Sequence, residues 1–246
     1  MNAMMNLNLR CAVFGASGGI GAALVSLLAA REDVAEVHAL SRSAVPSAGA
    51  HPKVTLHHFD LVDETSIASA CAAIAAPLDL AIVATGRLMR ESGEGPEKSW
   101  RALDPAAMAE VFAINAIGPA LIARHALPLL RKEGRPVFAA ISARVGSIAD
   151  NRLGGWHSYR AAKAALNMLV RNFAIELART NPAAVAVALH PGTVDTPLSR
   201  PFQRNVAPDK LFAPETAARH LLDVIDHLTT TDSGKLLAWN GAEIPF

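Results

Sequence analysis

A regular alternation of short apolar runs with longer helix-like stretches constrains the fold of this chain more than any other feature. Runs rich in valine, isoleucine and leucine predict seven strands, over residues 9–14, 34–40, 54–59, 78–84, 137–142, 185–190 and 236–239. Most of these runs lack the polar alternation of half-exposed strands. We therefore expect helices to cover both faces, as in a parallel sheet.

The intervening stretches predict five helices, over residues 19–31, 63–75, 105–132, 157–179 and 214–228. This alternation indicates an α/β fold with a doubly wound (Rossmann) sheet of about seven parallel strands. Gly118-Pro119 should break or kink the third helix, because proline lacks an amide donor and clashes with the preceding turn. We expect one domain over residues 1–246, with an N-terminal extension at 1–8 and a substrate loop at about 198–212.

Charge and residue usage argue against several partners. The chain has 23 basic and 22 acidic residues, so no positive excess favours nucleic acid or a membrane surface. Cys11 and Cys71 lie in apolar segments, and neither they nor the nine histidines show metal-ligand spacing, so we expect no disulfide and no metal site. The N-terminus resembles neither a signal peptide nor a membrane span, which favours a soluble, cytoplasmic protein.

A glycine-rich turn follows the first predicted strand and leads into the first predicted helix. Its sequence is Gly15-Ala16-Ser17-Gly18-Gly19-Ile20-Gly21. Glycines permit a tight turn, and the helix start directs free amides toward a pyrophosphate. The alternative is a turn that only packs strand against helix.

The end of the second predicted strand bears on the choice of cofactor. Ser41-Arg42-Ser43 stand where a carboxylate would otherwise bind a ribose diol. Because Arg42 offers a charged donor to a 2'-phosphate, NADP(H) is favoured over NAD(H). Alternatively, Arg42 is an ordinary solvated arginine.

Tyr159 and Lys163 form the candidate catalytic pair. They lie four residues apart in a predicted helix, so they share one face, and Tyr159 is the only tyrosine of the chain. Lowering a tyrosine pKa from about 10 to about 7 requires roughly 4 kcal/mol, which a nearby ammonium and an oxidised nicotinamide could supply. The alternative is that the pair is only structural, an exposed lysine and a partly buried tyrosine on one helix, and its position after a nucleotide-binding turn and a fifth predicted strand argues against this.

Taken in order, these motifs resemble the short-chain dehydrogenases/reductases. The pattern comprises the glycine turn, Asp60, Asn115, the Ser142 region, Tyr159 with Lys163, and Pro191-Gly192-x-Val194-x-Thr196. The segments 142–148, 154–155 and 158–160 are similar to the C-factor-like and carbonyl-reductase-like branch of that family.

The resemblance implies roles for individual residues. Tyr159 would be the general acid for carbonyl reduction, Lys163 would lower its pKa, Asn115 would hold a relay water, and Ser142 would orient the substrate. The implied cofactor-binding residues are Gly15, Ser17, Gly18, Gly19, Ile20, Gly21, Ser41, Arg42, Asp60, Leu61, Ala84, Thr85, Gly86, Tyr159, Lys163, Pro191, Gly192, Val194 and Thr196. Asp60 as a helix cap, Asn115 as a satisfied helix residue and Pro191-Gly192 as a simple turn remain alternatives.

Two departures from the family pattern affect this transfer. The substrate-orienting serine of the family falls on Ala143, one residue after Ser142, and adjacent strand residues point to opposite faces. We expect Ser142, re-aimed by a local bulge or turn, to supply the hydroxyl, with Ser147 as a reserve. The second departure is Val83-Ala84-Thr85-Gly86, where the family commonly has Asn-Asn-Ala-Gly.

The resulting expectation is an NAD(P)-dependent oxidoreductase that exchanges a hydride with a carbonyl or alcohol carbon. Only about fifty residues follow Thr196, too few for the substrate domain of nucleotide-sugar-modifying relatives. A non-catalytic NADP-binding regulator of the C-factor-like kind is the alternative. We expect a small-molecule substrate, with Trp156 and Phe202 as an apolar wall, and a homodimer or homotetramer.

Overall fold

The main sheet of the computed structural model has eight strands in the order β10-β9-β6-β5-β4-β1-β2-β3. The structure describes residues 8–43, 51–75 and 77–246, so residues 1–7 of the expected N-terminal extension lie outside it. The strands are β1 (Leu9–Phe14), β2 (Val34–Ser41), β3 (Val54–His58), β4 (Leu80–Val83), β5 (Val137–Ile141), β6 (Val185–His190), β9 (Leu236–Ala238) and β10 (Glu243–Ile244). The seven predicted strands are confirmed, and they pair in parallel.

The eighth strand, β10, was not predicted from the sequence. It pairs antiparallel with β9 after a tight reversal at Gly241, which has a φ of +80°. At two residues, β10 is too short to form a recognisable apolar run.

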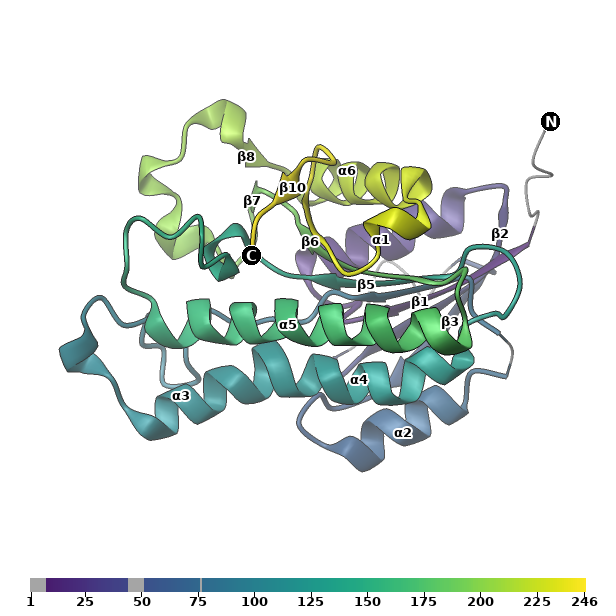
Figure 1. The fold of residues 1–246 in the computed structure, drawn as a ribbon, viewed down its shortest axis with the longest axis horizontal. Helices are drawn as coiled ribbons and strands as arrows, with labels where there is room; N and C mark the ends of the chain where they lie inside the picture. The colour runs from purple at the N-terminus through teal and green to yellow at the C-terminus, as the bar shows by residue number, and fades with distance from the viewer. Residues whose placement is uncertain (1–7, 44–50, 76) are drawn as a thin grey trace.

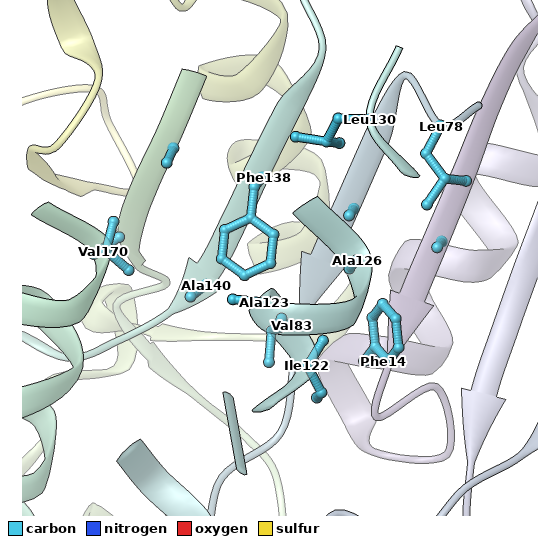
Figure 2. Packing of buried hydrophobic residues seen from close by; sticks show 14 of the residues in the cluster. Phe14, Leu78, Val83, Ile122, Ala123, Ala126, Leu130, Phe138, Ala140 and Val170 are labelled. Carbon is cyan, nitrogen blue, oxygen red and sulfur yellow. The ribbon is translucent and has the colours of Figure 1, made fainter. Parts of the chain in front are cut away.

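Helices cover both faces of the sheet (Figure 1). On one face lie α1 (Gly19–Ala30) and α6 (Pro214–His227), and on the other lie α2 (Glu64–Ala72), α4 (Gly118–Ala126) and α5 (His157–Thr180). Each face has its own buried apolar cluster. Phe138 of β5, for example, lies among Ile122 and Ala123 of α4 and Val170 of α5 (Figure 2). This sandwich confirms the doubly wound fold.

The third predicted helix is not broken at Gly118-Pro119. It runs from α3 (Pro105–Phe112) through a π-helical segment (Ala113–Ile117) into α4. The Gly118 amide donates to the carbonyl of Ala113, five residues back. This wider turn just before Pro119 lets the chain stay helical, which is the physical reason the predicted break does not occur.

The same helical run meets the length and composition of a membrane span. Among the described residues, Pro105–Leu129 is the one such run. It packs against α2 and α5 within the fold, and 44% of its most apolar window is buried. In this structure it is therefore a core helix beside the sheet.

The predicted substrate loop has more order than expected. A small parallel sheet joins β7 (Thr193–Val194) to β8 (Leu211–Phe212), on either side of that loop. Short 3-10 turns occur at Trp100–Ala102, Leu127–Leu129, Arg144–Gly146, Arg200–Asn205, Pro208–Lys210 and Thr230–Asp232. The pairing of β7 with β8 fixes both ends of the loop beside the carboxyl ends of the main strands.

Candidate active site

A cavity of about 650 Å³ opens at the carboxyl ends of the central parallel strands. Its walls come from the segments that follow β1, β4, β5 and β6 and from the first turn of α5. The strand order reverses between β1 and β4, which is where ligands of doubly wound sheets bind. The topology therefore brings the predicted motifs to one place.

The glycine turn forms one end of this cavity. Gly15 has a φ of +90°, and a Cβ added to Gly21 would lie 2.1 Å from the Gly15 carbonyl oxygen, so side chains are excluded at both positions. Gly18 caps α1 without a side-chain hydrogen bond, and Ser17, Gly18, Gly19 and Ile20 line the cavity. The first amides of α1 are thus free to bind an anion.

Two further predicted segments line the same cavity. Ala84, Thr85 and Gly86 follow β4, and Pro191, Gly192, Val194 and Thr196 follow β6. Gly192 has a φ of +81°, and a Cβ there would lie 2.7 Å from the Phe212 ring. Glycine is therefore required where the chain turns against β8.

Six predicted cofactor residues lie outside the cavity lining. Gly15 and Gly21 belong to the glycine turn itself, Ser41 ends β2 and Arg42 follows it, and Asp60 and Leu61 follow β3, at the same sheet edge as the glycine turn. Arg42 is exposed, whereas Asp60 accepts a hydrogen bond from the Val62 amide at 3.2 Å in a local turn. Their contact with a cofactor stays a prediction.

Tyr159 and Lys163 both line the cavity from the first turns of α5. The Lys163 Nζ lies 5.9 Å from the centre of the Tyr159 ring and donates to the Ile141 carbonyl at 3.0 Å. Burial raises the pKa of Tyr159 to about 12 and lowers the pKa of Lys163 to about 8. In the protein alone, burial therefore outweighs the pKa lowering that the sequence predicts for Tyr159.

Asn115 is fully buried in the π-helical segment. Its Nδ2 donates to the carbonyls of Arg87 at 2.8 Å and Val111 at 3.0 Å, and its Oδ1 accepts from the Arg87 amide at 3.1 Å. A Cβ on Gly86 would lie 3.3 Å from Asn115 Oδ1 and 3.6 Å from Lys163 Nζ. Asn115 thus anchors the segment after β4 close to Lys163.

The two candidate serines already have hydrogen-bond partners. Ser142 lines the cavity, but its hydroxyl donates to Oδ1 of Asn167 at 2.6 Å. The Ser147 hydroxyl donates to the Pro245 carbonyl. Ala143, by contrast, packs against the apolar group that contains Tyr159. The substrate-orienting role of Ser142 stays a prediction.

Glu97 is a site residue that sequence reasoning missed. It is only 6% exposed, and its carboxylate accepts hydrogen bonds from the Ser158 amide at 3.2 Å and from the Ser158 hydroxyl. Its carbonyl also accepts from the Trp156 amide at 2.5 Å. Burial opposes ionisation of Glu97, but the hydrogen bonds from Ser158 and from the Glu97 backbone, with the charge of Arg90, together lower the carboxyl pKa. Glu97 therefore caps the start of α5 through Ser158, the residue before Tyr159.

Comparison with known proteins identifies the family. Residues 10–207 match the family model described as short chain dehydrogenase. A curated relative, short-chain dehydrogenase srdF of Neurospora crassa, is 32% identical over 95% of this chain and 96% of its own length. This chain belongs to the short chain dehydrogenase family.

Two other similarities fit the expected branch of the short-chain dehydrogenases. The C-signal of Myxococcus xanthus is 39% identical over 60% of this chain and 85% of its own length. The crystal structure of an NADPH-bound carbonyl reductase from chicken fatty liver superposes with a TM-score of 0.84, at 27% identity, covering 98% of this chain and 100% of that one.

The residues of this short-chain dehydrogenase fit a nicotinamide dinucleotide. The uncapped start of α1 suits a pyrophosphate, and Gly15 and Gly21 leave no room for side chains that would obstruct it. Farther along the cavity, Thr85 Oγ1 is buried without a hydrogen-bond partner. No three metal-capable side chains gather within residues 8–43, 51–75 and 77–246.

The substrate end of this short-chain dehydrogenase is apolar. Trp156 and Phe202 pack edge to face with ring centres 4.9 Å apart, and Trp156 lies 6.4 Å from the Tyr159 ring. Leu198 and Val145 pack beside them. The wall expected from Trp156 and Phe202 is present.

Proposed function

We propose that this chain is an NADP(H)-dependent oxidoreductase that reduces the carbonyl of a small apolar molecule, with Tyr159 as general acid. The observation that carries the proposal is that Tyr159, Lys163 and the uncapped start of α1 all line one cavity. The nicotinamide, when bound, supplies the hydride. The chain's own residues hold the cofactor, orient the substrate and deliver the proton.

Burial keeps Tyr159 in the protonated form that carbonyl reduction needs. A pKa of about 12 keeps the phenol protonated near neutral pH, so it can donate to a carbonyl oxygen as charge develops there. Alcohol oxidation needs the phenolate as base. That direction would require the positive charges of Lys163 and of the oxidised nicotinamide to lower the Tyr159 pKa.

We assign the relay water to the main chain of Asn115. The Asn115 side chain is occupied by Arg87 and Val111, so the group that remains for a water is its carbonyl, in the π-helical segment. The α-helical partner of that carbonyl would be residue 119, a proline that has no amide hydrogen. In this proposal the carbonyl holds a water that replaces the proton of Tyr159 through Lys163.

Arg42 supports the preference for NADP(H). It is exposed at the carboxyl end of β2, and no acidic residue stands beside it to bind a ribose diol. An exposed guanidinium there suits a 2'-phosphate. We also propose a cytoplasmic location. We further propose a homo-oligomer, because the exposed apolar side chains of Ile117, Met168 and Ile175 lie on the outer helical layer.

The test is NADPH oxidation on a panel of aldehydes and ketones, with 4-nitrobenzaldehyde as the aromatic member. We expect measurable turnover, and the variant Tyr159→Phe should lose about 10²–10⁴-fold of it. NADPH affinity, measured by fluorescence titration, should change by less than about twofold, because the phenol hydroxyl is one of many cofactor contacts.

A non-catalytic NADP-binding regulator is the competing function. The observation in its favour is Ala143, which removes the expected hydroxyl, together with the similarity to the C-signal. NADPH binding without turnover on any member of the panel would select the regulator.

A further inference from the structure

None of the three residues considered for the serine position offers a free hydroxyl to orient a substrate. Ala143 offers none, the Ser142 proton is donated to Asn167, and the Ser147 proton is donated to Pro245. Ser142 would have to break a 2.6 Å buried hydrogen bond before it could donate to a carbonyl oxygen. Another polar group should therefore hold the substrate oxygen.

Two residues that line the cavity have a buried polar atom without a partner, among the residues that the structure describes. They are Thr85, through Oγ1, and His190, through Nδ1. Thr85 belongs to the cofactor end, because a Cβ on Gly15 would lie 3.0 Å from its methyl carbon. His190 is then the candidate at the substrate end. A buried polar atom without a partner destabilises a protein by about 1–3 kcal/mol, which a ligand in the cavity can offset.

The position of His190 in β6 places it beside the reaction centre. Strand β6 pairs with β5 through Leu189 and Ile141, and the Ser142 amide donates to the Leu189 carbonyl at 2.8 Å. Ala186 and Ala188 of β6 pack in the cluster on the α5 side, whereas Leu189 packs on the opposite side. By strand alternation, the side chain of His190 emerges on the α5 side, where Tyr159 and Lys163 lie.

The protonation state of His190 suits a neutral hydrogen-bond donor. Burial, with the nearby charge of Arg144, lowers its pKa to about 4. The ring is therefore uncharged near neutral pH and carries one N–H. An uncharged donor can hold a carbonyl oxygen without competing with Tyr159 for the proton.

We propose that the imidazole of His190 hydrogen-bonds the substrate oxygen, in the role that a serine hydroxyl at residue 143 would have. This inference rests on the proposed carbonyl reductase function. His190 orients the carbonyl and stabilises the charge that develops on its oxygen, while Tyr159 transfers the proton. The N–H stays on the imidazole throughout.

The test compares His190→Leu, His190→Asn, Ala143→Ser and the double variant His190→Leu/Ala143→Ser. With 4-nitrobenzaldehyde and NADPH, His190→Leu should lower kcat/KM at least about tenfold, since removing one donor to a developing oxyanion lowers the rate by up to about 10²–10³-fold. His190→Asn keeps a donor and should retain most of the activity. Ala143→Ser should restore most of the loss in the double variant, because it returns a hydroxyl to the expected position.

A second measurement needs no turnover. It is the Kd of 4-nitrobenzaldehyde for the protein loaded with NADP+, followed by quenching of tryptophan fluorescence. His190→Leu should weaken this binding several-fold, and Ala143→Ser should restore it. Affinity for NADPH alone should change by less than about twofold in all variants.

Three results would overturn the role of His190. In the first, His190→Leu has the same kcat/KM and the same aldehyde Kd as the native chain. In the second, Ala143→Ser does not restore kcat/KM in the double variant. In the third, His190→Asn loses as much kcat/KM as His190→Leu. The last two would mean that the ring only fills space. If the native chain turns over no carbonyl but its aldehyde binding still depends on His190, the proposed function fails and the role of His190 as a ligand stands.

Discussion

The start of α1 and the start of α5 both face the cavity, yet their first amides are used in different ways. The first turn of α1 has no capping side chain, so its amides are open to a ligand. In α5, the carboxylate of Glu97 accepts a hydrogen bond from the Ser158 amide in the first turn, although the two residues lie 61 positions apart in sequence. One helix presents its positive end to a cofactor, whereas the other has that end filled by the protein itself.

This difference reflects what each helix does. A pyrophosphate can be held by backbone amides alone, so glycines at the start of α1 are sufficient. A proton donor must be held within a fraction of an ångström of its target, which requires side chains from elsewhere to fix the backbone around Tyr159. The cofactor end is thus built locally and the catalytic end by long-range contacts.

The largest effect is expected at the α1 end. The Cβ of Gly21→Ala would lie 2.1 Å from the Gly15 carbonyl oxygen, so the turn has to move. We expect the NADPH Kd to rise at least about 100-fold, equivalent to about 2.7 kcal/mol, and the melting temperature to fall. Fluorescence titration and thermal unfolding measure the two effects.

Gly134→Ala is the matched control for this substitution. Gly134 has a positive φ of +74°, unlike Gly21, which is helical, and a Cβ there meets nothing within 4 Å. It should lose roughly 1–2 kcal/mol of stability from backbone strain and keep its NADPH affinity. Equal losses of affinity in the two variants would mean that the Gly15–Gly21 contact is not what holds the cofactor site.

The second prediction concerns Glu97 at the start of α5. Glu97→Gln loses the charge that accepts two hydrogen bonds from Ser158. We expect kcat to fall about tenfold, because a small displacement of Tyr159 lowers the rate of proton transfer, with NADPH affinity unchanged. Glu91→Gln, an exposed change in the same loop, is the control and should keep its kcat. If Glu97→Gln lowers the melting temperature but leaves kcat and its pH profile unchanged, Glu97 only stabilises the fold.

The two helix starts also show why the sequence predicted one end of the site better than the other. The glycine turn, Tyr159 and Lys163 are local patterns, and the structure brings them to one cavity as predicted. Glu97 could not be found this way, because its partner Ser158 is distant in sequence and no spacing connects them. A carboxylate in a glycine-rich loop gives no signal of burial.

Proline and serine illustrate two other limits of the sequence. Gly118-Pro119 predicts a break or a kink, but a π-helical turn before Pro119 keeps the chain helical, and Asn115 in that turn bonds Arg87 of a distant segment. Ser142 was expected to be re-aimed by a local bulge, whereas its hydroxyl donates to Asn167 on α5. Which hydroxyl is free depends on a partner in another element, and a motif in one element does not contain that information.

The third prediction uses pH to probe Lys163. Its folded pKa is about 8 because burial disfavours the ammonium, against about 10.5 when unfolded. Between these values the unfolded chain binds a proton that the folded chain does not, so the free energy of unfolding rises with pH. The slope is at most about 1.4 kcal/mol per pH unit. Urea unfolding of the cofactor-free protein at pH 7.5, 8.5 and 9.5 measures it.

Lys163→Met removes this titrating group, so the free energy of unfolding should rise less between pH 8 and 10. The contribution of Tyr159 has the opposite sign and comes later, because its pKa is raised from 10.0 to about 12. Stability from that group is present below pH 10 and is lost as the pH rises toward 12. An equal slope in the native chain and in Lys163→Met would show that Lys163 keeps its charge in the folded protein.

The smallest effect is expected from Arg42, which would extend the cofactor end beyond the glycine turn. Arg42 is exposed at the end of β2, so its attraction for a 2'-phosphate is weakened by solvent and salt. Arg42→Ala should raise the NADPH Kd about tenfold at low ionic strength, equivalent to about 1.4 kcal/mol, and leave the NADH Kd unchanged. Arg179→Ala, at the far end of α5, is the exposed arginine control and should change neither. Because added salt screens exposed charges, the NADPH effect should shrink as salt is added. If Arg42→Ala weakens the binding of NADPH and NADH equally, Arg42 stabilises the turn and does not bind the 2'-phosphate. The backbone of the glycine turn would then be the part of this end that binds the cofactor.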